Sequence, residues 1–122
     1  MSVLQYISDL MNELYIPYEF MVWSDETIPD PYFVGEYNEV ESATLEECGY
    51  QESTFILTGT GTSYSQLEAV KNEIKRVLQR TAILDDGTGI MVSYGYSLCI
   101  PTGEEKLKRI QINLIIKEWR VN

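Results

Sequence analysis

The fold is decided by the stretch Ile90-Met91-Val92-Ser93-Tyr94-Gly95-Tyr96-Ser97-Leu98-Cys99-Ile100, near the end of a chain of 122 residues. Larger apolar or aromatic residues alternate with other residues along its whole length. One face would carry Ile90, Val92, Tyr94, Tyr96, Leu98 and Ile100. Because successive side chains of a strand point to opposite faces, the pattern predicts a long strand with one buried face.

The residues that follow repeat this pattern after a turn. Pro101-Thr102-Gly103-Glu104-Glu105 has turn chemistry, and apolar residues then recur every second position at Ile110, Ile112, Leu114 and Ile116. The chain is therefore predicted to end in a long β-hairpin.

Two earlier segments carry apolar residues at helical spacing. The first has Val3, Leu4, Ile7, Leu10, Met11 and Leu14 before Pro17, and the second has Leu67, Val70, Ile74, Val77 and Leu78. Capping boxes are predicted at Ser2-Val3-Leu4-Gln5 and at Ser65-Gln66-Leu67-Glu68. We expect Lys75, Arg76 and Arg80 to gather at the C-terminus of the second helix, where the helix dipole favours cations.

Three β-prone segments complete the pattern, at 18–23, 31–37 and 51–60. The acidic stretch 38–49 between the last two predicts a solvated loop. The size fits one domain over residues 1–122. We expect an α+β domain with a mainly antiparallel or mixed sheet, two helices packed on one face and the long C-terminal β-hairpin.

Charge is divided unequally along the chain. The first basic residue is Lys71, and thirteen of the nineteen acids precede it, whereas all nine bases and six acids lie at or after it. The formal net charge of −10 disfavours direct binding to nucleic acid, which needs Lys and Arg to neutralise phosphates. Opposite charge on two halves of one chain is suited to head-to-tail self-association.

Catalytic and cofactor signals are weak. The chain has no histidine, which removes the commonest general base and most zinc sites, so we expect no enzyme, no cofactor and no metal. Gly59-Thr60-Gly61-Thr62 before a helix is read as a tight connection rather than a phosphate loop, because the Walker lysine is missing. Asp85-Asp86-Gly87-Thr88-Gly89 is read as an ordinary turn rather than a calcium loop.

The cysteines and the apolar segments bear on location. Cys48 and Cys99 come without an apolar N-terminal signal segment, which favours free thiols in a reducing compartment and no secretion by a signal peptide. No apolar stretch approaches the ~20 residues needed to cross a bilayer, so no membrane partner is expected.

The pattern as a whole resembles a family. The amphipathic N-terminal helix, the strand starting Pro31-Tyr32-Phe33-Val34, the strand Thr54-Phe55-Ile56-Leu57-Thr58, the second helix and a hairpin ending Gln111-Ile112-Asn113-Leu114-Ile115-Ile116 are similar to tail terminator, or tail completion, proteins of long-tailed bacteriophages and prophages. The resemblance covers nearly the whole chain and rests on order, length and composition.

The resemblance implies a role in assembly without chemistry. Family members form a ring, here expected to be a hexamer, that caps the tail tube and docks onto the head connector. The implied partners are further copies of the chain, a tail tube protein and a head-tail connector protein. The implied location is the virion, and the bacterial host cytoplasm during assembly.

The charge division predicts which residues meet in such a ring. Bases of one copy would contact acids of the region 25–52 in the next copy. The expected interface residues are Lys71, Lys75, Arg76, Arg80, Lys106, Lys108, Arg109, Asp25, Glu26 and Asp30.

Two alternatives of other classes remain open. An acidic protein of this charge could mimic DNA and occupy the groove of a basic nucleic-acid-binding partner. A small ligand-binding or enzyme domain could instead use the turn at Gly59–Ser65.

Overall fold

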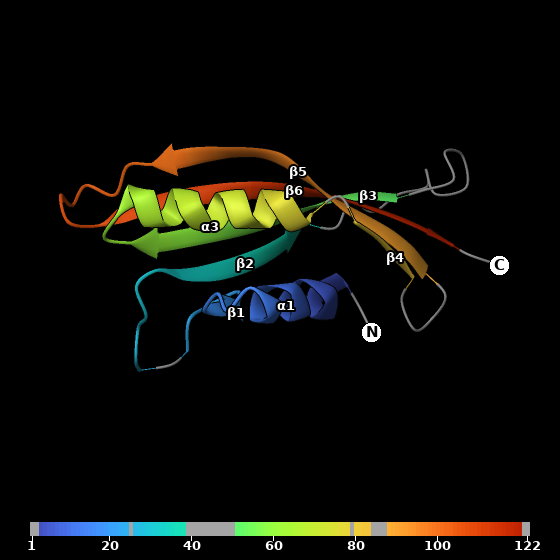
Figure 1. Cartoon of the computed structure of the whole chain (residues 1–122), viewed down its shortest axis with the longest axis horizontal. Helices are drawn as coiled ribbons and strands as arrows, with labels where there is room; N and C mark the ends of the chain where they lie inside the picture. Colours follow the sequence, from blue (N-terminus) through green and yellow to red (C-terminus); the bar gives the residue numbers. More distant parts are fainter. Residues whose placement is uncertain (1–2, 25, 39–50, 79, 84–87, 121–122) are drawn as a thin grey trace.

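Two helices and six strands make up the described part of the chain (Figure 1). The computed structural model describes residues 3–24, 26–38, 51–78, 80–83 and 88–120. The elements in chain order are α1 (Val3–Glu13), β1 (Tyr18–Phe20), β2 (Tyr32–Asn38), β3 (Gln51–Gly61), α3 (Tyr64–Val77), β4 (Arg80–Ile83), β5 (Thr88–Ile100) and β6 (Lys108–Arg120).

The strands form one mixed sheet in the order β1-β2-β3-β6-β5-β4. β1 pairs with β2 in parallel, and every other neighbouring pair is antiparallel. The long hairpin predicted from the alternation is β5–β6, and β3 pairs with β6 along its whole length. The predicted α+β class is therefore confirmed.

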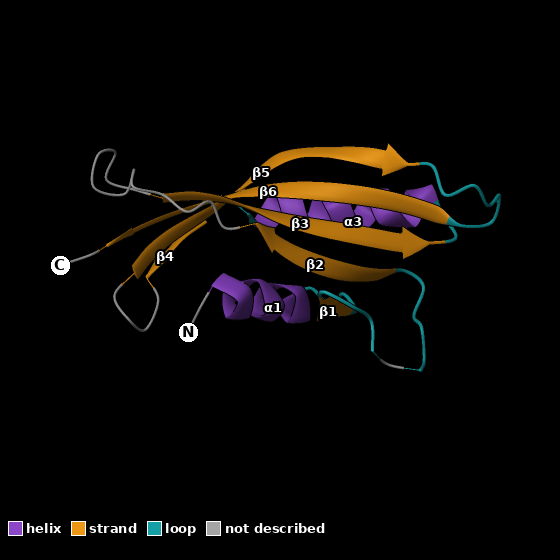
Figure 2. Ribbon diagram, turned by 180° about the vertical axis from the view of Figure 1, so that it is seen from behind, coloured by secondary structure: helices purple, strands orange, loops and turns teal. Residues whose placement is uncertain are grey.

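Both helices pack on one face of this sheet. α3 lies over β3 and β6, and α1 lies at the side of the sheet that carries β1 and β2 (Figures 1 and 2). Their apolar stripes and the inner face of the sheet share one hydrophobic core. The side chains that are almost completely buried in it include Ile7, Met11, Phe33, Phe55, Leu57, Leu67, Ile74, Ile90, Val92, Ile112, Leu114 and Ile116.

The helix boundaries correct two predictions. α3 is capped by Ser63 rather than Ser65, because Ser63 has extended backbone and its hydroxyl accepts a hydrogen bond from the amide of Gln66. Arg80 does not belong to the helix, which ends at Val77; it lies in β4, a short strand that the sequence did not predict. The predicted cap at Ser2 lies outside the described residues.

The first predicted strand is shorter than expected. β1 ends at Phe20 because the amide of Val22 donates to the Phe20 carbonyl across Met21, whose φ is 72°. This is a tight three-residue turn of a kind that is rare for a residue with a side chain. The loop predicted at 38–49 lies almost wholly outside the described residues. So do residues 85–87 of the next predicted turn, whereas Thr88 and Gly89 already belong to β5.

The alternation along β5 is interrupted once, and this overturns part of the face prediction. Tyr94 pairs with Leu114 but Tyr96 pairs with Asn113, so Gly95 is an extra residue in the strand. A Cβ at Gly95 would lie 2.8 Å from the carbonyl oxygen of Asn113. Ile90, Val92 and Tyr94 face the helices as predicted, but Tyr96, Leu98 and Ile100 follow the register of Asn113, Gln111 and Arg109 onto the opposite face.

Candidate assembly surfaces

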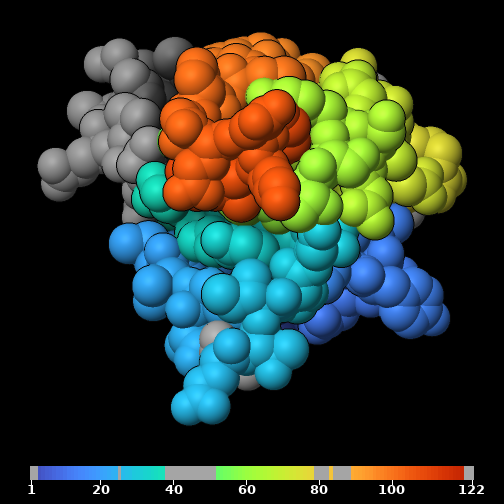
Figure 3. All heavy atoms as spheres, turned by 90° about the vertical axis from the view of Figure 1, so that its left-hand side faces the viewer, coloured from blue at the N-terminus to red at the C-terminus, as the bar shows by residue number. Residues whose placement is uncertain are grey.

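The charge division of the sequence becomes a division in space. The described residues of 3–38, which form α1, β1, β2 and their connections, carry six acids and no base. We call this part the acidic side; its acids are Asp9, Glu13, Glu19, Glu26, Asp30 and Glu36. We call the part made of α3, β5, β6 and the connection between them the basic side. Figure 3, seen from the hairpin tip, shows the two parts in opposite halves of the molecule.

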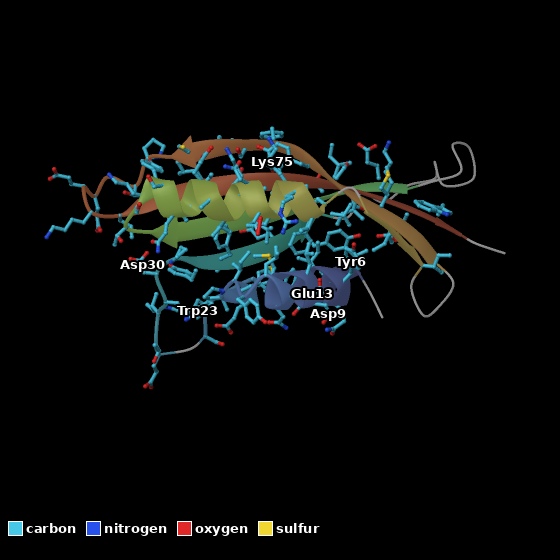
Figure 4. The ribbon with its side chains drawn as sticks, viewed as in Figure 1. Tyr6, Asp9, Glu13, Trp23, Asp30 and Lys75 are labelled. Atoms are coloured by element: carbon cyan, nitrogen blue, oxygen red, sulfur yellow. The ribbon has the colours of Figure 1, made fainter. Side chains whose placement is uncertain are left out.

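Labelled side chains make the separation visible. Asp9 and Glu13 lie on α1 at the outer limit of the acidic side, whereas Lys75 lies at the opposite limit, beside β5 (Figure 4). β3 separates β2 from β6, so the two sides lie toward opposite edges of the sheet. The molecule therefore has a negative side and a positive side, which are complementary in charge.

The acidic side also exposes large apolar side chains. Tyr15 is 93% exposed just before β1, and Met21, Val22 and Ile28 are exposed in the connection that follows it. Tyr15 and Met21 have φ values of 58° and 72°, a conformation that costs residues with a Cβ about 1–3 kcal/mol. Strained backbone together with exposed apolar groups is typical of a binding surface.

Asp30 has a structural role on this side. Its carboxylate accepts hydrogen bonds from the amide of Thr62 at 3.0 Å and from the Thr62 hydroxyl at 2.5 Å. These bonds join the connection after β1 to the start of α3. An anion of the chain itself therefore occupies the turn at Gly59–Ser65, the place where a phosphate would bind in the ligand-binding alternative.

Two predicted interface bases are paired within α3. The ammonium of Lys71 lies 2.6 Å from the carboxylate of Glu68, and the Nε of Arg76 lies 2.8 Å from that of Glu73. The hydrogen bond that Lys71 donates to Glu68 raises the pKa of Lys71, and the hydrogen bonds that Arg76 donates to Glu73 lower the pKa of Glu73. The Glu73–Arg76 pair is well exposed, so its contribution to stability is small.

Two other bases contact aromatic rings. The ammonium of Lys75 lies 4.6 Å from the centre of the Tyr94 ring, and that of Lys108 lies 5.5 Å from the Tyr64 ring centre. Both are cation–π distances. These contacts place Lys75 against β5 and Lys108 against the first residue of α3.

The remaining predicted residues are dispersed. The Nε of Arg109 donates to the Thr60 hydroxyl, Lys106 is exposed in the hairpin connection, and Glu26 is exposed between β1 and β2. The backbone of Arg80 pairs with Val92, and Asp25 lies outside the described residues. Within the described ranges, Glu26 and Asp30 form no ion pair with the predicted bases of the same chain.

Sequence reasoning missed the exposed apolar groups beside these charges. Tyr96 is 58% exposed and Leu98 is 43% exposed on the sheet face opposite the helices, which no described element covers (Figure 2). Their alternation indicated a buried face, and the only available signal for the change was the glycine at position 95.

The described residues hold neither a metal cluster nor a membrane-spanning helix. The ranges that the structure describes contain no group of three or more His, Cys, Asp or Glu residues placed to hold a metal ion. In the same ranges, neither helix is long and apolar enough to span a bilayer. Cys99 is a free, exposed thiol.

The fold and these surfaces define a two-layer α+β domain with one open sheet face and oppositely charged sides. No protein-family model, curated protein or solved structure matches the chain.

Proposed function

We propose that this protein is a structural subunit that assembles head to tail into a ring, as a tail terminator or head-tail neck component of a phage or prophage. The ring would cap the tail tube and dock onto the head connector, with no catalysis by the subunit. The observation that carries the proposal is the separation of the six acids of the acidic side from the bases of α3, β5 and β6 across one sheet.

A ring needs two different surfaces on each copy that fit one another. The acidic side offers carboxylates together with exposed Met21, Val22 and Ile28. The basic side offers the ammonium groups of Lys75 and Lys108 on its helix face and exposed Tyr96 and Leu98 on its open face. An apolar centre with a charged rim is the usual composition of a protein interface. Contact between unlike sides of successive copies closes a ring when the rotation permits it.

The solution mass tests this proposal. We expect light scattering after size exclusion to give about six times the 14.0 kDa of one chain at low salt, and a smaller average mass at high salt, because salt screens charge pairs at the rim. A monomer at every protein and salt concentration would contradict self-assembly.

Charge reversal identifies the interface. Lys106→Glu, Lys108→Glu and Arg109→Glu together are expected to reduce the assembled fraction at least tenfold, because they place negative charge opposite the acidic side. Glu68→Lys with Glu73→Lys is the control in the opposite sense, since it adds positive charge to the basic side. An unchanged mass for the triple variant would exclude these residues from the interface.

A second candidate function also draws on the acidic side. Six acids without a base on one side would suit a mimic of DNA that occupies a basic protein. Charge reversal distinguishes the two functions. For a DNA mimic, Asp9→Lys with Glu13→Lys would abolish binding to a basic partner. Reversal at Lys106, Lys108 and Arg109 would leave that binding intact.

A further inference from the structure

β5 has a long edge without a strand partner. The strand runs over Thr88–Ile100, but β4 pairs only with residues 89–92. In the part of the chain that the structure describes, Ser93–Ile100 therefore has a strand neighbour on the β6 side alone. Such an edge presents a row of main-chain N–H and C=O groups to any extended chain that approaches it.

Two lysines stand on the helix side of this edge. The ammonium of Lys75 lies over the Tyr94 ring, and Lys71 is close enough to interact electrostatically with Tyr94 and Cys99. Glu68 is the acid that faces the same place, and it is bound to Lys71. The helix side of the edge therefore carries a net positive charge, and Lys75 has no carboxylate beside it among the described ion pairs.

The other side of the edge is apolar. Beyond Gly95 the exposed side chains on this side are Tyr96 and Leu98, which point to the open face. The hydroxyl of Tyr94 donates to that of Ser97 at 2.7 Å. This bond links the two residues that flank Gly95 and Tyr96. The bulge therefore places an apolar pair along one side of the edge while Lys75 remains on the other.

We propose that the β5 edge, Ser93–Ile100, binds an extended strand of a partner chain in which acidic and apolar side chains alternate. Alternate side chains of an added strand point to opposite faces of the sheet. The acids would then face Lys71 and Lys75, and the apolar residues would cover Tyr96 and Leu98. Main-chain hydrogen bonds would supply affinity and the alternation would supply specificity.

This inference rests on the proposed assembly function, because it gives the chemistry of the partner that the basic side receives. It adds that the contact is made by strand addition and not by charged side chains alone. The edge of β5 is suited to this mode because it is long and, among the described residues, has no strand beside it. It also carries lysines on one face of the sheet and apolar side chains on the other.

A peptide of defined pattern tests the proposal on the full-length protein. The probe is a fluorescein-labelled nine-residue peptide that alternates Glu and Val, and binding is followed by fluorescence anisotropy. One control peptide has the same composition in two blocks, and a second has N-methyl groups on alternate amides. We expect each control to bind at least tenfold more weakly, because the first loses the alternation and the second loses the main-chain donors.

Matched variants locate the site. Lys75→Glu and Lys106→Glu change the net charge equally, but only Lys75 flanks the edge. We expect Lys75→Glu to weaken peptide binding about tenfold and Lys106→Glu to change it less than twofold. Leu98→Asp is expected to weaken it severalfold, and its exposed position allows the fold to be retained. Equal effects of Lys75→Glu and Lys106→Glu would overturn the proposal.

Amide hydrogen exchange distinguishes strand addition from nonspecific electrostatic attraction. Binding by strand addition is expected to slow hydrogen exchange selectively at amides within Ser93–Ile100. Slowing elsewhere, or equal binding of the N-methylated peptide, would overturn strand addition. Peptide binding is measured at protein concentrations low enough for a monomer, so its failure is distinct from a failure of ring assembly, which the solution mass reports.

Discussion

The two halves of β5 have the same alternating sequence pattern but different environments. Before Gly95, Ile90 and Val92 are completely buried against the helices; after it, Tyr96 and Leu98 are exposed on the opposite face. The difference arises from one extra residue, since a shift by one position moves every following side chain to the other face. Alternation along a strand therefore predicts which residues share one face of the sheet only as far as the next bulge.

The largest expected effect comes from truncating one apolar side chain in each half of β5. Ile90→Ala is expected to lower the free energy of unfolding by about 2–5 kcal/mol, because it leaves a cavity in the core. Leu98→Ala is expected to change it by less than about 1 kcal/mol, because that side chain already contacts solvent. Urea unfolding followed by tryptophan fluorescence measures both, and equal losses would mean that both halves are buried.

The next test concerns the bulge itself. Gly95→Ala places a Cβ 2.8 Å from the Asn113 carbonyl, and we expect a loss of about 1–3 kcal/mol because the strands must separate to admit it. Ser93→Ala, on the same strand and half-buried, is the control and is expected to change stability by less than about 0.5 kcal/mol. A Gly95→Ala variant as stable as the control would show that β5 relaxes without cost.

Most of the fold was predictable from the sequence because its signals are local. Helical spacing before Pro17 predicted α1, and the period of two from Ile110 to Ile116 predicted β6. The predictions that failed depend on contacts between residues distant in the sequence. β4 is defined by its pairing with β5, and the shift at Gly95 is defined by the register between β5 and β6. No local pattern marks β4, and the glycine at position 95 is the one local sign of the shift.

The candidate surfaces were predictable in charge but not in detail. The count of acids before Lys71 indicated two unlike parts, and the sheet order places them on opposite sides. The roles of individual residues could not be predicted from the sequence. Asp30 accepts a hydrogen bond from Thr62, and Arg76 forms an ion pair with Glu73. These contacts require the turn geometry after β3 and the helical phase of α3, which a list of charges does not contain.

The smallest expected effect on stability comes from removing one of two tyrosine hydroxyls. The hydroxyl of Tyr94, at the boundary between the halves of β5, donates to Ser97, whereas the buried hydroxyl of Tyr18 has no hydrogen-bond partner among the described residues. Tyr94→Phe is expected to lower stability by about 1 kcal/mol, because it removes a bond that is made. Tyr18→Phe is expected to leave it unchanged or raise it by up to about 1 kcal/mol, because it removes an unsatisfied buried group.

Alkaline pH tests the burial of the Tyr18 hydroxyl. Burial raises the pKa of Tyr18 to about 12 from an ordinary value of 10.0, so the folded state keeps a proton that the unfolded state loses. The corresponding stability is fully present below pH 10 and is lost as the pH rises through 12. The wild type should therefore lose more stability than Tyr18→Phe over this interval, in urea titrations at each pH. Parallel losses in the two proteins would mean that the Tyr18 hydroxyl reaches solvent.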